Sequence, residues 1–156
     1  MQGRRPLRLG LVQLAAALLV ACGDGADAPY LELAGGGFVL NYRLAEADYG
    51  FVVRVLRRLP EGSVLEARFE DPAGGPPIVV RQPARATRSQ YVFRTPPVRG
   101  VVAGRDYRVE LLLLGAGGGV ALARLEHAFH ADVDQTVLPV RPPVVGPGYQ
   151  RAPPGS

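Results

Sequence analysis

The chain has 156 residues, is 47% hydrophobic and carries 18 basic and 14 acidic residues, for a formal net charge of +4. Three of the basic residues, Arg4, Arg5 and Arg8, precede residue 22, so the remainder has 15 arginines, 14 carboxylates and a net charge of +1. A chain so close to neutral lacks the basic surface that phosphate binding requires, which excludes a nucleic-acid-binding protein. The one cysteine, Cys22, excludes an internal disulfide, so the fold must depend on burial of apolar side chains.

Residues 1–21 have the three parts of a secretory signal peptide. A basic segment that ends at Arg8 is followed by a 13-residue apolar run over residues 9–21, interrupted only by Gly10 and Gln13, and the run ends in the small residue Ala21. As a helix this run would be about 20 Å long, which is short of the ~30 Å hydrocarbon core of a bilayer. The pattern therefore predicts an exported protein and not a permanent transmembrane span.

The end of the apolar run, Leu19-Val20-Ala21-Cys22, resembles the lipobox of bacterial lipoproteins. The resemblance implies that the Cys22 thiol receives a diacylglycerol and that cleavage leaves Cys22 as the new N-terminus. It implies a protein of the bacterial cell envelope, attached to a membrane by its lipid. Gly23 in place of an aspartate favours the outer membrane, by analogy with proteobacterial lipoproteins. The alternative is a cytosolic protein whose apolar N-terminus happens to contain a cysteine.

Residues 22–29 are small and polar, and we expect them to form a lipidated tether in front of one domain over residues 30–135. In this domain apolar residues alternate with polar ones, which is the period of half-buried strands. The triplet Gly35-Gly36-Gly37 is interpreted as a turn between the first two strands. Strands are predicted over residues 30–33, 38–45, 49–58, 64–70, 78–80, 90–95, 107–114 and 120–130.

One of these strands has a helical alternative, and another is expected at a sheet edge. Residues 49–58 also fit an amphipathic helix, with Phe51 and Val55 on the apolar side, but Gly50 and the many valines favour a strand. Residues 78–80 follow Pro76 and Pro77 and are expected at a sheet edge, because proline donates no hydrogen bond to a ladder. Short strands separated by Gly and Pro turns, with no long helix, predict an all-β antiparallel sandwich of about seven to eight strands.

The stretch Gly100-Val-Val-Ala-Gly-Arg-Asp-Tyr-Arg-Val-Glu-Leu111 resembles the E–F corner of fibronectin type III domains. In that family an apolar residue, a tight turn and a tyrosine precede an alternating strand, and Val101, Gly104 and Tyr107 match these positions. Ala103 stands where the family has its turn proline, and the chain has no tryptophan to match that of strand B. The resemblance implies an immunoglobulin-like sandwich in which Tyr107 is the structural tyrosine corner, with its hydroxyl bonded to backbone upstream.

Residues 136–156 contain six prolines among Gly, Val and Arg, and we expect an extended or disordered tail. Such a tail is either a solvated end or a ligand for another protein.

No enzyme chemistry is predicted. His127 and His130 are three apart on one strand and therefore point to opposite faces, and only His130 would share a face with Asp132 and Asp134, so neither a metal nor a cofactor is expected. The serines Ser63, Ser89 and Ser156 lie in no nucleophile elbow. The loop 115–119 is rich in glycine but joins two strands, so it lacks the helix N-terminus of a phosphate site.

One feature points to a partner. If strands 49–58 and 106–114 lie in the same sheet, an apolar contact patch forms on its outer face from Val52, Leu56, Leu112 and Leu114. The alternatives are that the tail or a loop covers these residues, or that the strand register differs by one residue. We expect a non-enzymatic envelope protein that presents its sandwich loops or a sheet face to another envelope component. One alternative is an accessory lipoprotein of a secretion or surface-assembly system that docks through its tail, and another is a small hydrolase or carbohydrate-binding domain.

Overall fold

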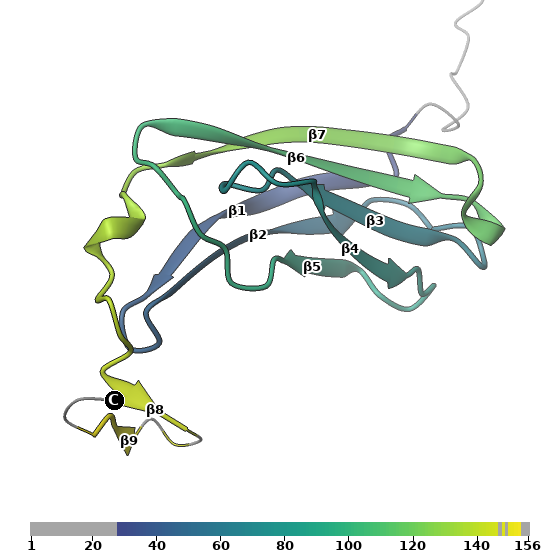
Figure 1. Cartoon of the computed structure of the whole chain (residues 1–156). Helices are drawn as coiled ribbons and strands as arrows, with labels where there is room; N and C mark the ends of the chain where they lie inside the picture. The colour runs from purple at the N-terminus through teal and green to yellow at the C-terminus, as the bar shows by residue number, and fades with distance from the viewer. Residues whose placement is uncertain (1–27, 147, 149, 154–156) are drawn as a thin grey trace, which may run out of the picture.

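The computed structural model describes residues 28–146, 148 and 150–153, so the predicted signal peptide and most of the tether lie outside the described residues. The described chain is all-β and forms two antiparallel sheets and a small hairpin (Figure 1). Its only helical segments are two 3₁₀ turns, η2 (Ala116–Gly118) and η3 (Gln135–Val137). Within this part of the chain no helix is long and apolar enough to cross a bilayer.

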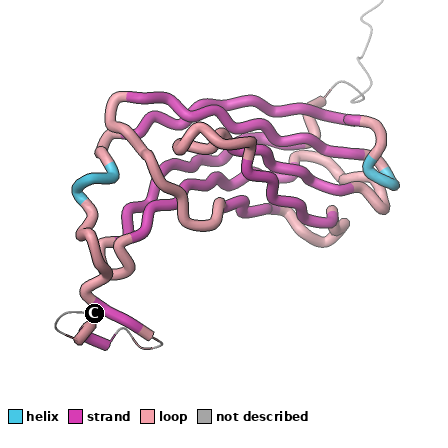
Figure 2. Tube along the Cα trace, viewed as in Figure 1, coloured by secondary structure: helices cyan, strands magenta, loops and turns pink. Residues whose placement is uncertain are grey.

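Seven strands make up the two sheets. One sheet has the order β1-β2-β5, and the other has the order β4-β3-β6-β7. Figure 2 shows the strands as two layers that run along the long axis of the molecule. The strands are β1 (Leu31–Asn41), β2 (Glu46–Val55), β3 (Val64–Phe69), β4 (Ile78–Pro83), β5 (Gln90–Arg94), β6 (Arg105–Leu114) and β7 (Ala121–Ala131).

The core lies between the two sheets and is built from the alternate residues of each strand. The three-stranded sheet contributes Phe51 and Phe93, whose ring centroids are 5.4 Å apart, and the four-stranded sheet contributes Phe69, whose ring is 5.4 Å from that of Phe51. These stacked and tilted rings add specific packing to the burial of apolar area. The predicted inward residues of two strands are confirmed as buried: Leu65, Ala67, Phe69, Tyr91 and Phe93.

Other sequence-based predictions are confirmed. Residues 49–55 are a strand and not a helix, because Tyr49, Phe51 and Val53 alternate into the core at the period of a strand. The β4 strand lies at the edge of its sheet. The glycine-rich stretch 115–119 joins β6 to β7 as an antiparallel hairpin.

The interpretation of Gly35-Gly36-Gly37 as a turn was wrong. All three glycines lie inside β1, which continues past them to Asn41 with a register shift between Leu33 and Gly35. A Cβ atom at Gly36 would stand 2.5 Å from Cζ of Phe129 on β7 and 2.5 Å from the carbonyl oxygen of Gly50. Gly36 therefore serves a close approach between elements, which is the other common use of glycine in a strand.

The placement of strands 49–58 and 106–114 in the same sheet was also wrong. The β2 strand pairs with β1 and β5, whereas β6 pairs with β3 and β7 in the opposite sheet. The outer faces of β2 and β6 therefore point away from each other, on the two sides of the molecule.

The strand registers define the two ends of the sandwich. The start of β1 pairs with the end of β2, and the start of β3 pairs with the ends of β4 and β6, so these points share one end with the loops 56–63, 84–89 and 115–120. We call this the N-proximal end. The loops 42–45, 70–77 and 95–104 and the segment after β7 lie at the far end, where Figure 1 shows the C-terminal hairpin.

The segment after residue 135 has more local structure than an extended or disordered tail. Leu138 packs against the core, and β8 (Val144–Val145) pairs with β9 (Gln150–Arg151). Gln135 accepts a hydrogen bond from the Val101 amide at 3.2 Å and donates one to the Val98 carbonyl at 2.9 Å. The packed part of the chain therefore extends at least to Leu138.

Candidate functional site

The residues of the predicted lipobox, Leu19, Val20, Ala21 and Cys22, lie outside the described residues. They precede β1 closely, since Cys22 is nine residues before Leu31. Nine extended residues span at most about 30 Å. A lipid on Cys22 would therefore hold the N-proximal end, and not the far end, next to a bilayer.

The four residues predicted to form an apolar patch do not form one surface. Val52 lies on the outer face of the three-stranded sheet, and Leu56 follows β2 in a loop with half of its surface exposed. Leu112 and Leu114 lie on β6 in the other sheet, and Leu112 is only 8% exposed. The patch is therefore dispersed, because its members belong to opposite sheets.

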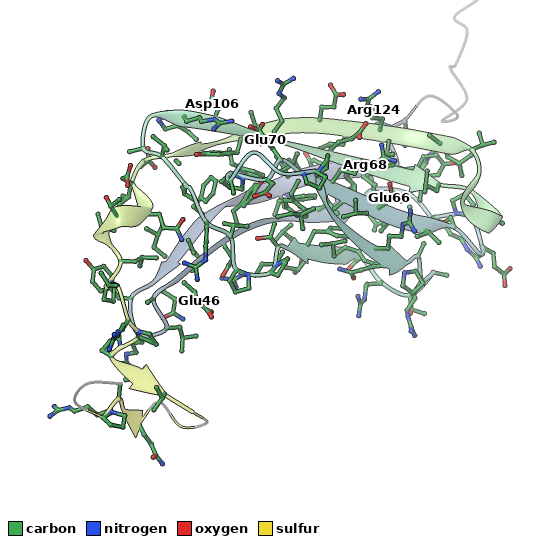
Figure 3. The ribbon with its side chains drawn as sticks, in the orientation of Figure 1. Glu46, Glu66, Arg68, Glu70, Asp106 and Arg124 are labelled. Carbon is green, nitrogen blue, oxygen red and sulfur yellow. The ribbon has the colours of Figure 1, made fainter. Side chains whose placement is uncertain are left out.

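The outer face of the four-stranded sheet carries an ion-pair ladder instead of an apolar patch. Glu66 Oε2 lies 2.6 Å from Arg81 Nε on β4, and its Oε1 lies 2.7 Å from Arg68 Nε (Figure 3). Glu110 on β6 then contacts Arg68 at 3.4 Å and Arg124 on β7 at 2.6 Å. The ladder, which ends at Glu126, consists of Arg81, Glu66, Arg68, Glu110, Arg124 and Glu126.

Glu66 is the buried centre of this ladder. Its strand neighbour is Leu112, whose other neighbour in the sheet is Arg124, so Leu112 lies among ladder residues. Burial alone would raise the pKa of Glu66, but hydrogen bonds and charge from Arg81 and Arg68 outweigh it and lower the pKa below its usual value. Because opposite charges satisfy each other along the ladder, this face is not an apolar docking surface.

The outer face of the three-stranded sheet is hollowed and apolar. At its centre three outward positions on β1 and β2 are glycines, and the walls are the side chains of Val39, Val52 and Val92 around a depression of about 350 Å³. We call this the glycine hollow; its glycines are Gly35, Gly37 and Gly50.

The glycine hollow is built into the backbone. Gly37 has a φ of 152°, a conformation that L side chains rarely adopt, and a Cβ at Gly50 would overlap the backbone carbonyl of Phe93 on β5. Ion pairs flank it: Glu32 with Arg54 at 3.7 Å on one side, and Asp48 with Arg94 on the other. An apolar floor between paired charges is an arrangement that suits contact with another molecule.

The apolar patch predicted from the sequence included Val52 but not Val39, Val92 or the glycines of the hollow. A usable signal was present, because Gly35 and Gly37 are two apart and so lie on the same face of a strand. The alternating charges of Glu66, Arg68 and Glu70 were a similar signal for the ladder.

Two buried tyrosines stabilise loops at the far end. Tyr107 accepts a hydrogen bond from the Val102 amide at 2.8 Å, which ties the loop 95–104 to the start of β6. Tyr49 donates to the backbone carbonyl of Glu70, and burial together with the nearby Glu70 and Asp71 raises the pKa of Tyr49 well above its usual range. Both hydroxyls satisfy backbone groups, so their role is structural.

The histidines lie on opposite faces of β7, as predicted. His130 on the outer side contacts Asp106 at 2.7 Å, and His127 packs edge-on against the ring of Phe129 on the inner side. His127 lines a groove of about 650 Å³ between the edge strands β1 and β7. The described residues contain no cluster of three or more side chains suited to hold a metal ion.

Ser63 is buried, and its hydroxyl donates a hydrogen bond to the Pro60 carbonyl at 2.6 Å, which is a contact within a turn.

No family model and no curated protein matches the chain. Among solved structures it resembles an endonuclease/exonuclease/phosphatase from Beutenbergia cavernae, with a TM-score of 0.35 and 18% sequence identity. The match covers 62% of this chain and 27% of that protein. A likeness this distant supports no inference about fold or activity.

Proposed function

We propose that this chain is a lipid-anchored protein of the bacterial cell envelope, attached to the outer membrane, whose β-sandwich is a non-enzymatic binding module. The observation that carries the proposal is the position of the lipobox. Cys22 follows a basic and then an apolar segment and precedes the first strand by nine residues. An acylated Cys22 would hold the sandwich within about 30 Å of the bilayer.

The finer fold assignment within the proposal is an immunoglobulin-like sandwich of the fibronectin type III kind. The strand orders β1-β2-β5 and β4-β3-β6-β7 support this assignment, because strands that follow one another along the chain are distributed over two antiparallel sheets. The hydroxyl of Tyr107 also bonds to backbone five residues upstream, as a tyrosine corner does.

The surface that best suits the partner is the glycine hollow, and the partner is another envelope protein. Val92 at this site is 60% exposed and pairs with Val52, which in turn pairs with Gly35. The opposite face of the sandwich is less suited, because its charges are paired and its Leu112 is buried. An apolar side chain from the partner can fill a hollow that has no side chains of its own in the middle.

The anchor is tested first, in cells of the bacterial host. Metabolic labelling with a palmitate analogue and mass spectrometry should show diacylglycerol on Cys22 and a mature chain that starts there. Cys22→Ser should abolish both. An unmodified thiol on a soluble, uncleaved chain would contradict the proposal.

The partner surface is tested with a matched pair of variants. Val92→Asp places a charge in the glycine hollow on edge strand β5, whereas Val79→Asp places one on edge strand β4 of the other sheet, where Val79 is 49% exposed. Photo-crosslinking in intact cells should capture an envelope protein in the wild type and with Val79→Asp, and should lose it with Val92→Asp. Equal capture by the two variants would show that the partner binds elsewhere.

A second candidate is an accessory lipoprotein of a secretion or surface-assembly system that docks through residues 136–156. One observation favours it: the C-terminal segment leaves the sandwich at the far end, and Val140 in it is fully exposed. Removal of residues 141–156 keeps Leu138 on the core, so a loss of partner capture by this truncated protein would favour the tail over the glycine hollow.

A further inference from the structure

The loops of the N-proximal end are basic, whereas the charges of the far end balance. The loops 56–63, 84–89 and 115–120 contain four arginines and one carboxylate, Glu61. The far-end loops 42–45, 70–77 and 95–104 and the segment 132–153 contain four arginines and four carboxylates. A net positive charge on the loops is therefore confined to the N-proximal end of the sandwich.

Three exposed arginines of the N-proximal loops have no carboxylate close by among the residues that the structure describes. The guanidinium groups of six arginines on the strands lie within 4 Å of a carboxylate, namely Arg54, Arg68, Arg81, Arg94, Arg105 and Arg124, whereas among the described residues those of Arg108 on β6 and Arg99 at the far end do not. In the described part of the chain no carboxylate lies within that distance of Arg58, Arg85 or Arg88, which are all exposed. Arg57 lies beside them, with its guanidinium 3.6 Å from the centre of the Tyr30 ring.

Apolar side chains are exposed at the same end of the sandwich. Val120 in the β6–β7 loop is 70% exposed, Leu56 in the β2–β3 loop is 50% exposed, and Leu122 at the start of β7 is 41% exposed. Exposed aliphatic side chains at the same end as arginines with no carboxylate close by, such as Arg58 and Arg85, suit the boundary of a bilayer, where the apolar groups enter the acyl region and the cations meet phosphate.

We infer that the N-proximal end is a membrane-contact surface that binds acidic phospholipid, with Arg58, Arg85 and Arg88 on the headgroups and Val120 inserted beneath them. The inference rests on the proposed function, because the acylated Cys22 would bring this end of the sandwich to the bilayer. It adds that the body of the domain, and not only its tether, contacts the lipid. The sandwich then stands on the membrane with its far end directed outward.

The test uses the chain's single cysteine. In Cys22→Ser/Val120→Cys the only thiol is at position 120, so a bimane probe there reports contact with vesicles that contain a nitroxide-labelled lipid, whether or not the protein is acylated. The same measurement on acylated Val120→Cys, where the Cys22 thiol is blocked by lipid, examines the native anchor. Cys22→Ser/Val140→Cys carries the probe at the far end as the control.

We expect the probe at residue 120 to be quenched on vesicles with acidic phospholipid, less so on zwitterionic vesicles, and the probe at residue 140 to stay unquenched on both. Added salt should reduce the quenching. Arg58→Glu/Arg85→Glu should weaken the contact at least about 25-fold, near five-fold for each charge removed, while Arg99→Glu at the far end should leave it unchanged.

Three results would overturn the inference. The first is no quenching at residue 120, and the second is equal quenching on acidic and zwitterionic vesicles. The third is arginine-dependent binding of dextran sulfate with no quenching on vesicles, which would identify a soluble polyanion as the occupant. Failure of the proposed function would look different, because mass spectrometry would then find Cys22 without lipid whatever the quenching shows.

Discussion

Phe129 on β7 packs directly over Gly36 on β1, so that the edge strands of the two sheets meet at a position where only glycine fits. A methyl group at residue 36 would stand 2.5 Å from the Phe129 ring and from the Gly50 carbonyl. The carbonyl belongs to backbone and cannot turn aside, so the overlap must be relieved by movement of strands.

Gly36→Ala should therefore destabilise the domain by about 3 kcal/mol, the cost of overpacking a closed core. Gly119→Ala is the matched control, because a Cβ there meets nothing within 4 Å and the backbone has an ordinary φ of −88°. Urea unfolding followed by circular dichroism measures both variants. Equal stability of the two variants would show that β1 and β7 do not make this contact in solution.

Glu66→Gln should destabilise the domain by about 1–2 kcal/mol at neutral pH, because the neutral side chain loses two charge-assisted hydrogen bonds. The folded-state pKa of Glu66 lies below its unfolded value of about 4.5, so its carboxylate contributes stability above that value and loses it as the pH falls through the lower, folded pKa. The stability difference between wild type and Glu66→Gln should thus disappear in strong acid.

The control for this prediction is Glu126→Gln at the exposed end of the ladder, which should change stability by less than about 0.5 kcal/mol. Unfolding free energies across an acid pH series test both variants. A Glu66→Gln difference that stayed constant with pH would mean that the pKa of Glu66 is the same in the folded and the unfolded protein, which would contradict the two ion pairs assigned to it.

Tyr107→Phe should cost about 1–2 kcal/mol of stability, because it leaves the Val102 amide without its partner at the edge of the core. Tyr42→Phe removes a hydroxyl from a side chain that is 57% exposed and should have no measurable effect. Thermal unfolding compares the two, and hydrogen exchange at Val102 should accelerate only in Tyr107→Phe. Unchanged exchange at this amide would contradict the assigned hydrogen bond.

Gln135→Ala should destabilise the domain by about 1–2 kcal/mol, because its side chain joins the Val98 carbonyl and the Val101 amide in the loop between β5 and β6.

Removal of residues 141–156 should shift the melting temperature by less than about 2 °C, since the chain is kept past Leu138. Calorimetry on the two variants places the boundary of the folded unit, and a large loss on truncation would move it beyond residue 140.

The sequence by itself determined the local features of this protein. Alternation predicted most of the strands and the inward side of β3 and β5, as at Leu65, Phe69, Tyr91 and Phe93, because side-chain direction in a regular strand depends on the parity of neighbouring residues. Gly and Pro turns marked the hairpin at residues 115–119. The lipobox stays a prediction, and it depends only on adjacent residues.

Only the tertiary structure decided which strands share a sheet and which glycines lie inside one. The sheet partners of β2 and β6 depend on long-range pairing, and the need for glycine at residue 36 arises from Phe129, which is 93 residues away in the chain. The alternation of the sequence predicts that Leu112 is exposed on an outer face. It is buried beside Glu66 and Arg124, because side chains from three strands meet on that face. Such contacts join residues whose separation along the chain carries no periodic signal.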